Sequence, residues 1–365
     1  MTRSPALTAT LALALLAAAV PVAAQEEPVG RFGERIQVTE VLLDVLVTDS
    51  TGNVVVGLDE RDFVVEEEGQ PVDIGSATFY GSERILGSPA LAARLEPAGA
   101  SPTDRFFILF FHDLRREAPR LLRQQRDATV QSRHWVEQSL GENDWVAVVS
   151  YYAKLRIHQD FTQDRDLVLA GLDSVARGKD PDATWSAAAQ LGDGPSLTRH
   201  LAQGKDLRKQ TTRFQDGLKV LGEAAANIRG RKNMVLFSIG FGDLDRFGWK
   251  PDQRYYPRTK RALNDANVAV YAIGLAGNAF SRDPVIEALS HSLNQLAVDT
   301  GGRHYQTFAS FAAPLKEVVE DNSGYYLLSY SAEYSAGDSG YREVSVKTTN
   351  PKLRVRARDG YLFGG

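Results

Sequence analysis

The sequence contains a run of six apolar residues, FFILFF at positions 106–111, that ends abruptly in His112 and Asp113. Four of the six are aromatic, and the run lacks the polar–apolar alternation of a strand with one face in water. It is also much shorter than the roughly 20 apolar residues of a membrane span. The run therefore predicts a strand buried on both faces, at the centre of a parallel sheet.

A regular alternation of strands and helices continues from this run. Further buried strands are expected at residues 145–152, 234–239 and 268–274, with an edge strand at 154–161 and a short one at 304–307. Helical patterns fill residues 121–140, 164–177, 214–229, 284–300 and 311–322, whereas residues 241–258 are expected to be a loop. Buried strands that alternate with helices predict a doubly wound, Rossmann-like α/β domain over residues 105–323.

The flanks of this domain have the pattern of antiparallel β structure. Residues 34–80 carry a long alternating strand, expected to place Val38, Val41, Leu43, Val45 and Val47 on one face, and two shorter strands. Residues 324–361 carry three more strands, and residues 81–104, rich in Gly, Ser, Pro and Ala, form a linker. Because three strands alone bury little surface, we expect the two flanks to share one small β domain into which the α/β domain is inserted.

The first residues have the composition of a signal peptide. A single arginine precedes an apolar stretch at residues 6–20, and small residues before Gln25 predict cleavage after Ala24, so that residues 1–24 are removed. An uncleaved anchor is the alternative, but the stretch is short for a span of roughly 20 residues. We expect a periplasmic or extracellular bacterial protein with no transmembrane segment in the mature chain and, since cysteine is absent, no disulfides.

Several kinds of chemistry lack their motifs. There is no Gly-x-Ser-x-Gly elbow, no Walker motif and no closely spaced histidine pair, and the glycines at 240 and 242 lack the third glycine of a dinucleotide fingerprint. The formal net charge of −4 argues against a nucleic-acid partner. His112 and His304 are expected to make local hydrogen bonds rather than bind metal.

Two features near residue 113 leave alternatives open. Asp113 is either a carboxylate that stabilises the N-terminus of the following helix or a binding residue, because open α/β sheets hold ligands where their strands end. The arginine-rich stretch from residue 115 to 126 forms either a solvated helix face or a patch for an anionic partner.

A strand that ends in Asp113, a helix opened by Thr212 and a strand followed by Gly240 together resemble a von Willebrand factor type A domain. The flanks strengthen the resemblance and are similar to the VWFA-related proteins of Acidobacteria and other soil bacteria. The segments that carry it are 45–54, the pairs 62–63 and 68–69, 160–164, 324–328 and 353–361. The match covers residues 36–361.

The resemblance implies a divalent-cation site at the end of the sheet, with a motif Asp-x-Ser-x-Ser, a threonine and a further Asp. At these positions the chain has Asp113, Arg115, Glu117, Thr212 and Ile239. Both serines and the second carboxylate are missing, whereas Mg²⁺ prefers about six oxygen ligands. We therefore expect a degenerate site without a metal cofactor, in which Arg115 pairs with Asp113 or Glu117. A rearranged Mg²⁺ or Mn²⁺ site that uses Glu117 and Asp243 is the alternative.

The sequence thus favours a protein-binding module for adhesion or scaffolding rather than an enzyme. Its unknown protein partner would contact the end of the sheet near Asp113, Arg115, Glu117, Thr212 and Asp243. The first alternative is an enzyme of the α/β hydrolase or phosphatase type, which would need a nucleophile beside a base. The second is a structural envelope protein in which the β domain binds the partner.

Overall fold

The computed structural model describes residues 36–81, 104–113, 122–178, 194–245, 248–250, 252–275, 284–306, 310–335 and 337–364. The predicted signal peptide and nearly all of the predicted linker lie outside these residues, as do Arg115 and Glu117.

The apolar run forms strand β5 (Arg105–His112), and every residue from Phe106 to His112 is buried. Among the described residues, β5 lies inside a six-stranded sheet of order β12-β11-β8-β5-β6-β7. It pairs in parallel with β6 (Asp144–Tyr151) and β8 (Lys232–Ser238). The mixed α/β fold with a central parallel sheet, predicted from this run, is therefore confirmed.

The remaining strands extend the sheet on both sides of these three. Strands β11 (Val268–Gly274) and β12 (Arg303–Gln306) continue the parallel pairing beyond β8. Strand β7 (Leu155–Thr162) pairs antiparallel with β6 and closes the opposite edge. The carboxyl ends of the parallel strands consequently lie together at one end of the sheet, which we call the top face.

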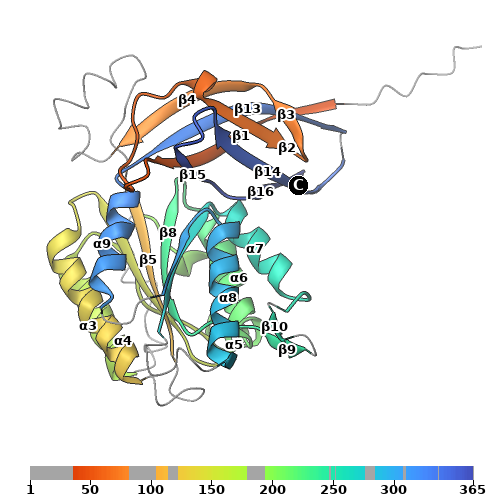
Figure 1. The fold of residues 1–365 in the computed structure, drawn as a ribbon. Coiled ribbons are helices and arrows are strands. Elements are labelled where there is room, and N and C mark those ends of the chain that lie inside the picture. The colour runs from red at the N-terminus through yellow and green to blue at the C-terminus, as the bar shows by residue number, and fades with distance from the viewer. Residues whose placement is uncertain are drawn as a thin grey trace, which may run out of the picture. The chain divides into compact units, whose positions relative to one another are not determined.

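Helices cover both faces of this sheet (Figure 1). Helices α3 (Leu122–Ser139), α4 (Arg165–Arg177) and α9 (Ala312–Asp321) pack on one face, against Phe107, Leu109 and Phe111 of β5. Helices α6 (Phe214–Ala225), α7 (Tyr256–Asp265) and α8 (Pro284–Asp299) pack on the other, against the alternate residues Phe106, Ile108 and Phe110. Successive side chains of a strand point to opposite faces, so one short run supplies both layers of the core.

The flanking segments form two four-stranded antiparallel sheets within the described part of the chain. One has the order β15-β1-β13-β4 and joins β1 (Ile36–Thr48), β4 (Ile74–Gly81), β13 (Gly324–Ser335) and β15 (Arg354–Arg356). The other has the order β16-β14-β2-β3 and joins β2 (Phe63–Glu67), β3 (Gln70–Val72), β14 (Gly340–Thr348) and β16 (Gly360–Phe363).

Each antiparallel sheet contains strands from both ends of the described chain. Val41 pairs with Tyr330 and Val45 with Tyr326, which is the contact between the two flanks expected from the sequence. Side chains from both sheets share one apolar core that includes Leu43, Phe63 and Val344.

Three details of the sequence interpretation were wrong. Val38 is 60% exposed. The residues of β1 in the shared apolar core, from Val41 to Val47, have odd numbers, and the even-numbered Val38 points to the other face of the strand. Helix α7 occupies part of the expected loop and the residues after it. Its sequence is strongly hydrophilic, and two of its five buried residues, Thr259 and Asn264, are polar, so few apolar residues mark it as a helix. Strand β16 was not predicted.

The short elements around the sheet are set by local polar contacts. Asp160, within the 160–164 motif, is fully buried and accepts hydrogen bonds from Leu197 N (2.9 Å), Thr198 N (3.0 Å) and Ser196 Oγ (2.8 Å). It thereby holds the 3-10 turn Thr198–His200, which precedes helix α5 (Gly204–Gln210). Asp164 accepts from Asp166 N and caps α4. This motif therefore has a structural role.

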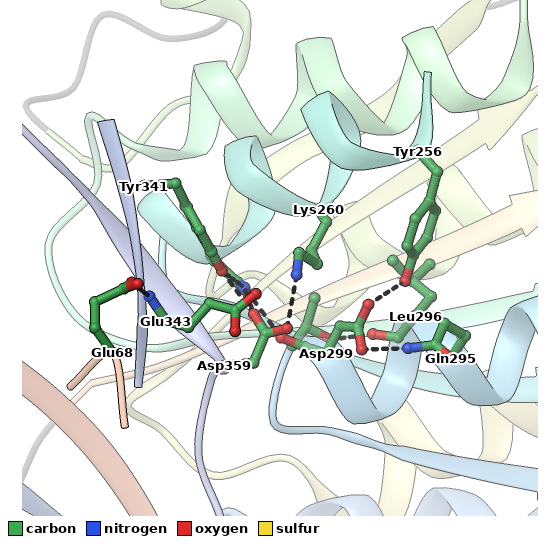
Figure 2. A network of polar contacts seen from close by, with 11 residues as sticks. Glu68, Tyr256, Lys260, Gln295, Leu296, Asp299, Tyr341, Glu343 and Asp359 are labelled. Atoms are coloured by element: carbon green, nitrogen blue, oxygen red, sulfur yellow. Dashed lines mark hydrogen bonds and ion pairs between the residues drawn. The ribbon is translucent and has the colours of Figure 1, made fainter. Parts of the chain in front are cut away.

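A polar network joins the last strands of the chain to helices α7 and α8 (Figure 2). Asp359 accepts hydrogen bonds from Tyr341 (2.6 Å) and Asn264 (2.7 Å), and it forms an ion pair with Lys260 (2.8 Å). Nearby, Asp299 accepts from Tyr256 at 2.7 Å. Burial raises the pKa of Asp299, and the hydrogen bond from Tyr256 partly offsets that rise.

Within the described residues, no helix combines the length and the apolar character needed to cross a membrane.

Candidate functional site

A pocket of about 510 Å³ opens at the top face, where β5, β6 and β8 end and α6 begins. This is the position at which open α/β sheets bind their ligands. The residues that line it are His112, Tyr151, Thr212, Arg213, Phe214, Gln215, Ile239, Gly240, Phe241, Gly242, Asp252, Arg254, Tyr255 and Leu289.

Aromatic rings form the inner wall of the pocket. Phe214, the first residue of α6, stacks on the His112 ring with centroids 4.2 Å apart. Tyr151 and Phe241 contact Phe214 at centroid distances of 5.4 and 5.5 Å. Each ring comes from a different element, so the packing of α6 on the sheet creates this wall and holds it rigid.

Arginine and tyrosine side chains form the outer rim. The guanidinium of Arg213 lies 4.3 Å from the centre of the Tyr255 ring, and that of Arg254 lies 5.5 Å from it. Both arginines are well exposed, with 54% and 74% of their side-chain surface accessible. Arg254 also forms an ion pair with Asp252 at 2.8 Å. Arg213 likewise lies 3.7 Å from Asp216, so ring stacking and an ion pair together hold each exposed guanidinium in place.

Gly240 allows the loop after β8 to approach helix α8. Its φ of +109° is a conformation that residues with a side chain rarely adopt. A Cβ atom at this position would lie only 2.1 Å from the backbone oxygen of Leu289. The Ser238 hydroxyl accepts a hydrogen bond from Gly240 N at 3.0 Å, which fixes the turn.

A serine and a histidine meet beneath the pocket. Ser238 Oγ lies 2.9 Å from His112 Nδ1, a contact across 126 residues of sequence. A nucleophile beside a base was not anticipated, because Ser238 has no Gly-x-Ser-x-Gly motif. However, Ser238 has no exposed surface and does not line the pocket. The contact therefore joins β5 to β8 and satisfies two buried polar side chains.

The structure brings together only part of the predicted site. Thr212 and Ile239 line the pocket. Asp113 is buried directly after β5, where its N–H donates to Tyr151 O at 2.9 Å, and it is not among the lining residues. Asp243 begins β9 (Asp243–Asp245), which pairs with β10 (Gly248–Lys250). Arg115 and Glu117 lie outside the described residues, so their expected contacts remain predictions.

Thr212 is exposed and does not open the helix through its side chain. The residue before α6 is Arg213, and no side chain caps the first turn. The neighbouring Thr211 is instead fully buried, donating to Leu207 O at 2.8 Å and accepting from Leu155 N at 3.0 Å. Thr211 thus ties the turn between α5 and α6 to strand β7, and Thr212 is left at the surface of the pocket.

The lining of the pocket does not fit a divalent cation. Its one carboxylate, Asp252, is paired with Arg254, and Ile239 presents an alkyl side chain. Across the described ranges, no cluster of three or more His, Cys, Asp or Glu side chains is arranged to hold a metal ion. The donor set therefore falls well short of the six oxygens that Mg²⁺ prefers.

Sequence reasoning missed the rim residues Arg213, Arg254 and Tyr255. Arg213 could have been predicted as a site residue, since it follows Thr212 directly. Its stacking partner, however, is 42 positions away in a segment expected to be a loop, and no sequence pattern predicts that contact.

No protein-family model matches the chain, and no curated protein matches its sequence. Among solved structures, the chain is similar to proximal thread matrix protein 1 from the mussel byssus, with 15% identity over 60% of this chain and a TM-score of 0.36. It spans only 47% of the mussel protein.

The similar structures also include von Willebrand factor A domains. The vWF domain of the type V pili tip protein Mfa5 from Porphyromonas gingivalis has 12% identity over 60% of this chain and 95% of that chain, with a TM-score of 0.37. The ArnB paralog VWA2 from Sulfolobus acidocaldarius has 11% identity over 90% and 75%, with a TM-score of 0.34. At these TM-scores the likenesses carry no argument about what this chain binds.

Proposed function

We propose that the chain is a protein-binding module, for adhesion or scaffolding, that contacts its partner at the top face. The observation that carries this proposal is the rim of Arg213, Arg254 and Tyr255 around a rigid aromatic wall. Arginine and tyrosine dominate binding hot spots, because each combines a large contact area with polar groups that can be paired. A pre-ordered rim also loses little side-chain entropy on binding.

We further propose that the module belongs to the VWFA-related proteins of the Acidobacteria type, with residues 105–323 inserted into a β domain made of residues 34–80 and 324–361. Supporting this organisation, Gly81 pairs with Gly324, so the described chain leaves and re-enters the antiparallel sheets at neighbouring positions. Closely spaced ends are what an inserted domain requires. The apolar segment at residues 6–20 supports a secreted or periplasmic location.

The enzyme alternative has one specific observation in its favour, the contact between Ser238 and His112. A catalytic serine must reach its substrate, and Ser238 is enclosed. We propose that the chain is not an enzyme. Covalent labelling of Ser238 by a fluorophosphonate probe would overturn this and favour a hydrolase.

The top face is expected to bind Mg²⁺ or Mn²⁺ poorly. Arg115, Glu117 and Ile239 stand in the sequence where the metal-binding motif has two serines and an aspartate, so three oxygen ligands of that motif are missing. Calorimetric titration of the purified chain should show no binding with a micromolar dissociation constant, which corresponds to a binding free energy of about −8 kcal/mol. A variant with Arg115→Ser, Glu117→Ser and Ile239→Asp should gain affinity. Micromolar binding by the wild-type chain would contradict a degenerate site.

The proposed partner surface can be tested by placing a photo-crosslinking amino acid at Thr212, which is exposed on the pocket. The full chain, expressed in its source cells, is expected to give a discrete crosslinked product from this position. Residues at a contact surface come within a few ångströms of the partner, whereas residues elsewhere do not.

Two exposed valines provide matched control positions. Val130 lies on α3 and Val38 on β1, and they are 52% and 60% exposed. Neither should yield the product obtained from Thr212. A product from Val38 alone would show that the β strands bind the partner, and equal yields from all three positions would contradict a top-face site.

A further inference from the structure

Strand β4 (Ile74–Gly81) is the edge strand of the sheet β15-β1-β13-β4 (Figure 1). Its inner edge pairs antiparallel with β13. Gly75 has no counterpart in β13, and the pairing is regular from Ser76 to Gly81. Because alternate backbone groups of an edge strand point away from its neighbour, this regular stretch presents N–H and C=O groups outward.

Among the described residues, no hydrogen bond engages the outer edge of β4. The backbone of the strand bonds to β13, and the contact of Ser76 Oγ with Ser329 Oγ at 2.8 Å also leads to β13. The 3-10 turn Glu60–Asp62 lies next to β4, but no hydrogen bond joins the two. An unpaired edge of this kind is a template for a further strand.

Other sheet edges in the described part of the chain carry residues that prevent such pairing. Charged residues or proline occur in β3, β7, β9, β10, β12 and β15, among them Pro71, Arg156, Arg303 and Arg354. Strand β16 is free of them but has only four residues. Strand β4 has eight residues and neither a charge nor a proline, so its edge is open to another strand.

A second copy of β4 fits this edge better than a foreign segment. Strand addition to a foreign peptide draws its specificity from pockets for alternate side chains. No β4 residue lines the top-face pocket or the three other pockets described for this part of the chain. A second β4 needs no such pocket, has the same length and places no charge opposite a like charge.

The side chains of β4 are also compatible with their own copies. Ser76, Thr78 and Tyr80 occupy one face of the regular stretch, and hydroxyl side chains pair favourably across strands. Tyr80 stacks on Tyr325 of β13 with ring centroids 5.7 Å apart, which adds an ordered aromatic surface beside the edge. Aromatic side chains are enriched in protein interfaces.

Two-fold symmetry would close this contact after one step. Rotation about an axis perpendicular to the sheet joins two β4 strands antiparallel and makes one continuous sheet of twice the width. Each copy uses its own β4 edge in the contact. The outer strands of the joined sheet are then the two copies of β15, whose Arg354 and Arg356 oppose further pairing. The assembly therefore ends at a dimer.

We propose that the chain forms a two-fold symmetric dimer in which the outer edge of β4, over Ser76–Gly81, pairs with the same edge of a second copy. The axis passes close to Thr78, near the middle of the regular stretch. The dimer carries two copies of the top face, so a partner with repeated binding sites is held by both. The strand contact itself does not involve the top face, and its test is independent of the partner.

Disulfide trapping tests the strand contact selectively, because the chain has no cysteine of its own. Thr78→Cys is oxidised alone and in equal mixtures with Ser76→Cys or Tyr80→Cys, which covers the registers centred on positions 77, 78 and 79. Opposite residues of an antiparallel pair have Cα atoms about 4.5–5.5 Å apart, within the range of a disulfide. At least one sample is expected to give a covalent dimer of the purified full chain on a non-reducing gel. Val130→Cys, 52% exposed on α3, should give none.

Sedimentation equilibrium measures the dimer without a disulfide. The wild-type chain is expected to dimerise reversibly between micromolar and millimolar concentration. Thr78→Lys should raise the dissociation constant about tenfold, because it brings two ammonium groups together near the axis. Gln70→Lys adds the same charge to the exposed edge strand β3 and should leave the constant unchanged. A wild-type chain that stays monomeric, equal weakening by both lysines, or no covalent dimer from any β4 sample would overturn the proposal.

Discussion

Replacing Gly240 with alanine is expected to lower the free energy of unfolding by about 3 kcal/mol and to abolish crosslinking from Thr212. The new Cβ would lie 2.1 Å from Leu289 O, so the loop after β8 or helix α8 must move. The backbone φ of +109° adds a strain that glycine does not have. Gly240 and Leu289 both line the pocket, so this movement would also displace the aromatic wall. Urea denaturation of both proteins measures the change in stability.

Gly337→Ala is the matched control for this prediction. Gly337 has a similar φ of +96°, but a Cβ there would meet nothing within 4 Å. The free energy of unfolding of this variant should therefore fall only by the cost of the backbone strain, about 1 kcal/mol. If both variants lose the same stability, the contact with helix α8 is not the reason that position 240 needs glycine.

The sequence was most informative where a single physical requirement decides the structure. The run at 106–111 has no polar residue, so it requires apolar neighbours on both faces, and β5 has those neighbours. Helix α7 was missed because it buries Thr259 and Asn264 through specific hydrogen bonds, to Gln215 O and Asp299 O. Such polar burial becomes favourable only when the partner is in place, and no local pattern encodes it.

The candidate site was likewise predicted only in part. Thr212 and Ile239 could be placed near the end of the sheet because their strand and helix were predicted. The contact between His112 and Ser238 could not, because it depends on the register of two strands distant in sequence. The stacking of Arg213 on Tyr255 depends likewise on how two loops meet.

A second large effect is expected inside the antiparallel sheets, at Glu67. This carboxylate at the end of β2 is buried and accepts hydrogen bonds from Tyr330 and Tyr361, both at 2.6 Å. It also forms an ion pair with Arg342. Burial alone would raise the pKa of Glu67, but the two tyrosine hydroxyls and the guanidinium outweigh it and lower the pKa below its usual 4.5. Glu67 thus links β2 to β13, β14 and β16.

Glu67→Gln is expected to lower the free energy of unfolding near pH 7 by about 2 kcal/mol, because it leaves the Arg342 guanidinium without its carboxylate. Since the folded-state pKa lies below the unfolded one, the contribution of Glu67 is fully present above pH 4.5. It is lost as the pH falls through the lowered folded-state pKa. The stability difference between the wild-type chain and Glu67→Gln should therefore shrink below pH 4.5, as measured by urea denaturation at several pH values.

Glu66→Gln, on the same strand but with Ser345 and Lys347 as its partners at the surface, should show little change at any pH. A difference that stays constant into strong acid would mean that packing, and not the carboxylate charge, gives Glu67 its effect.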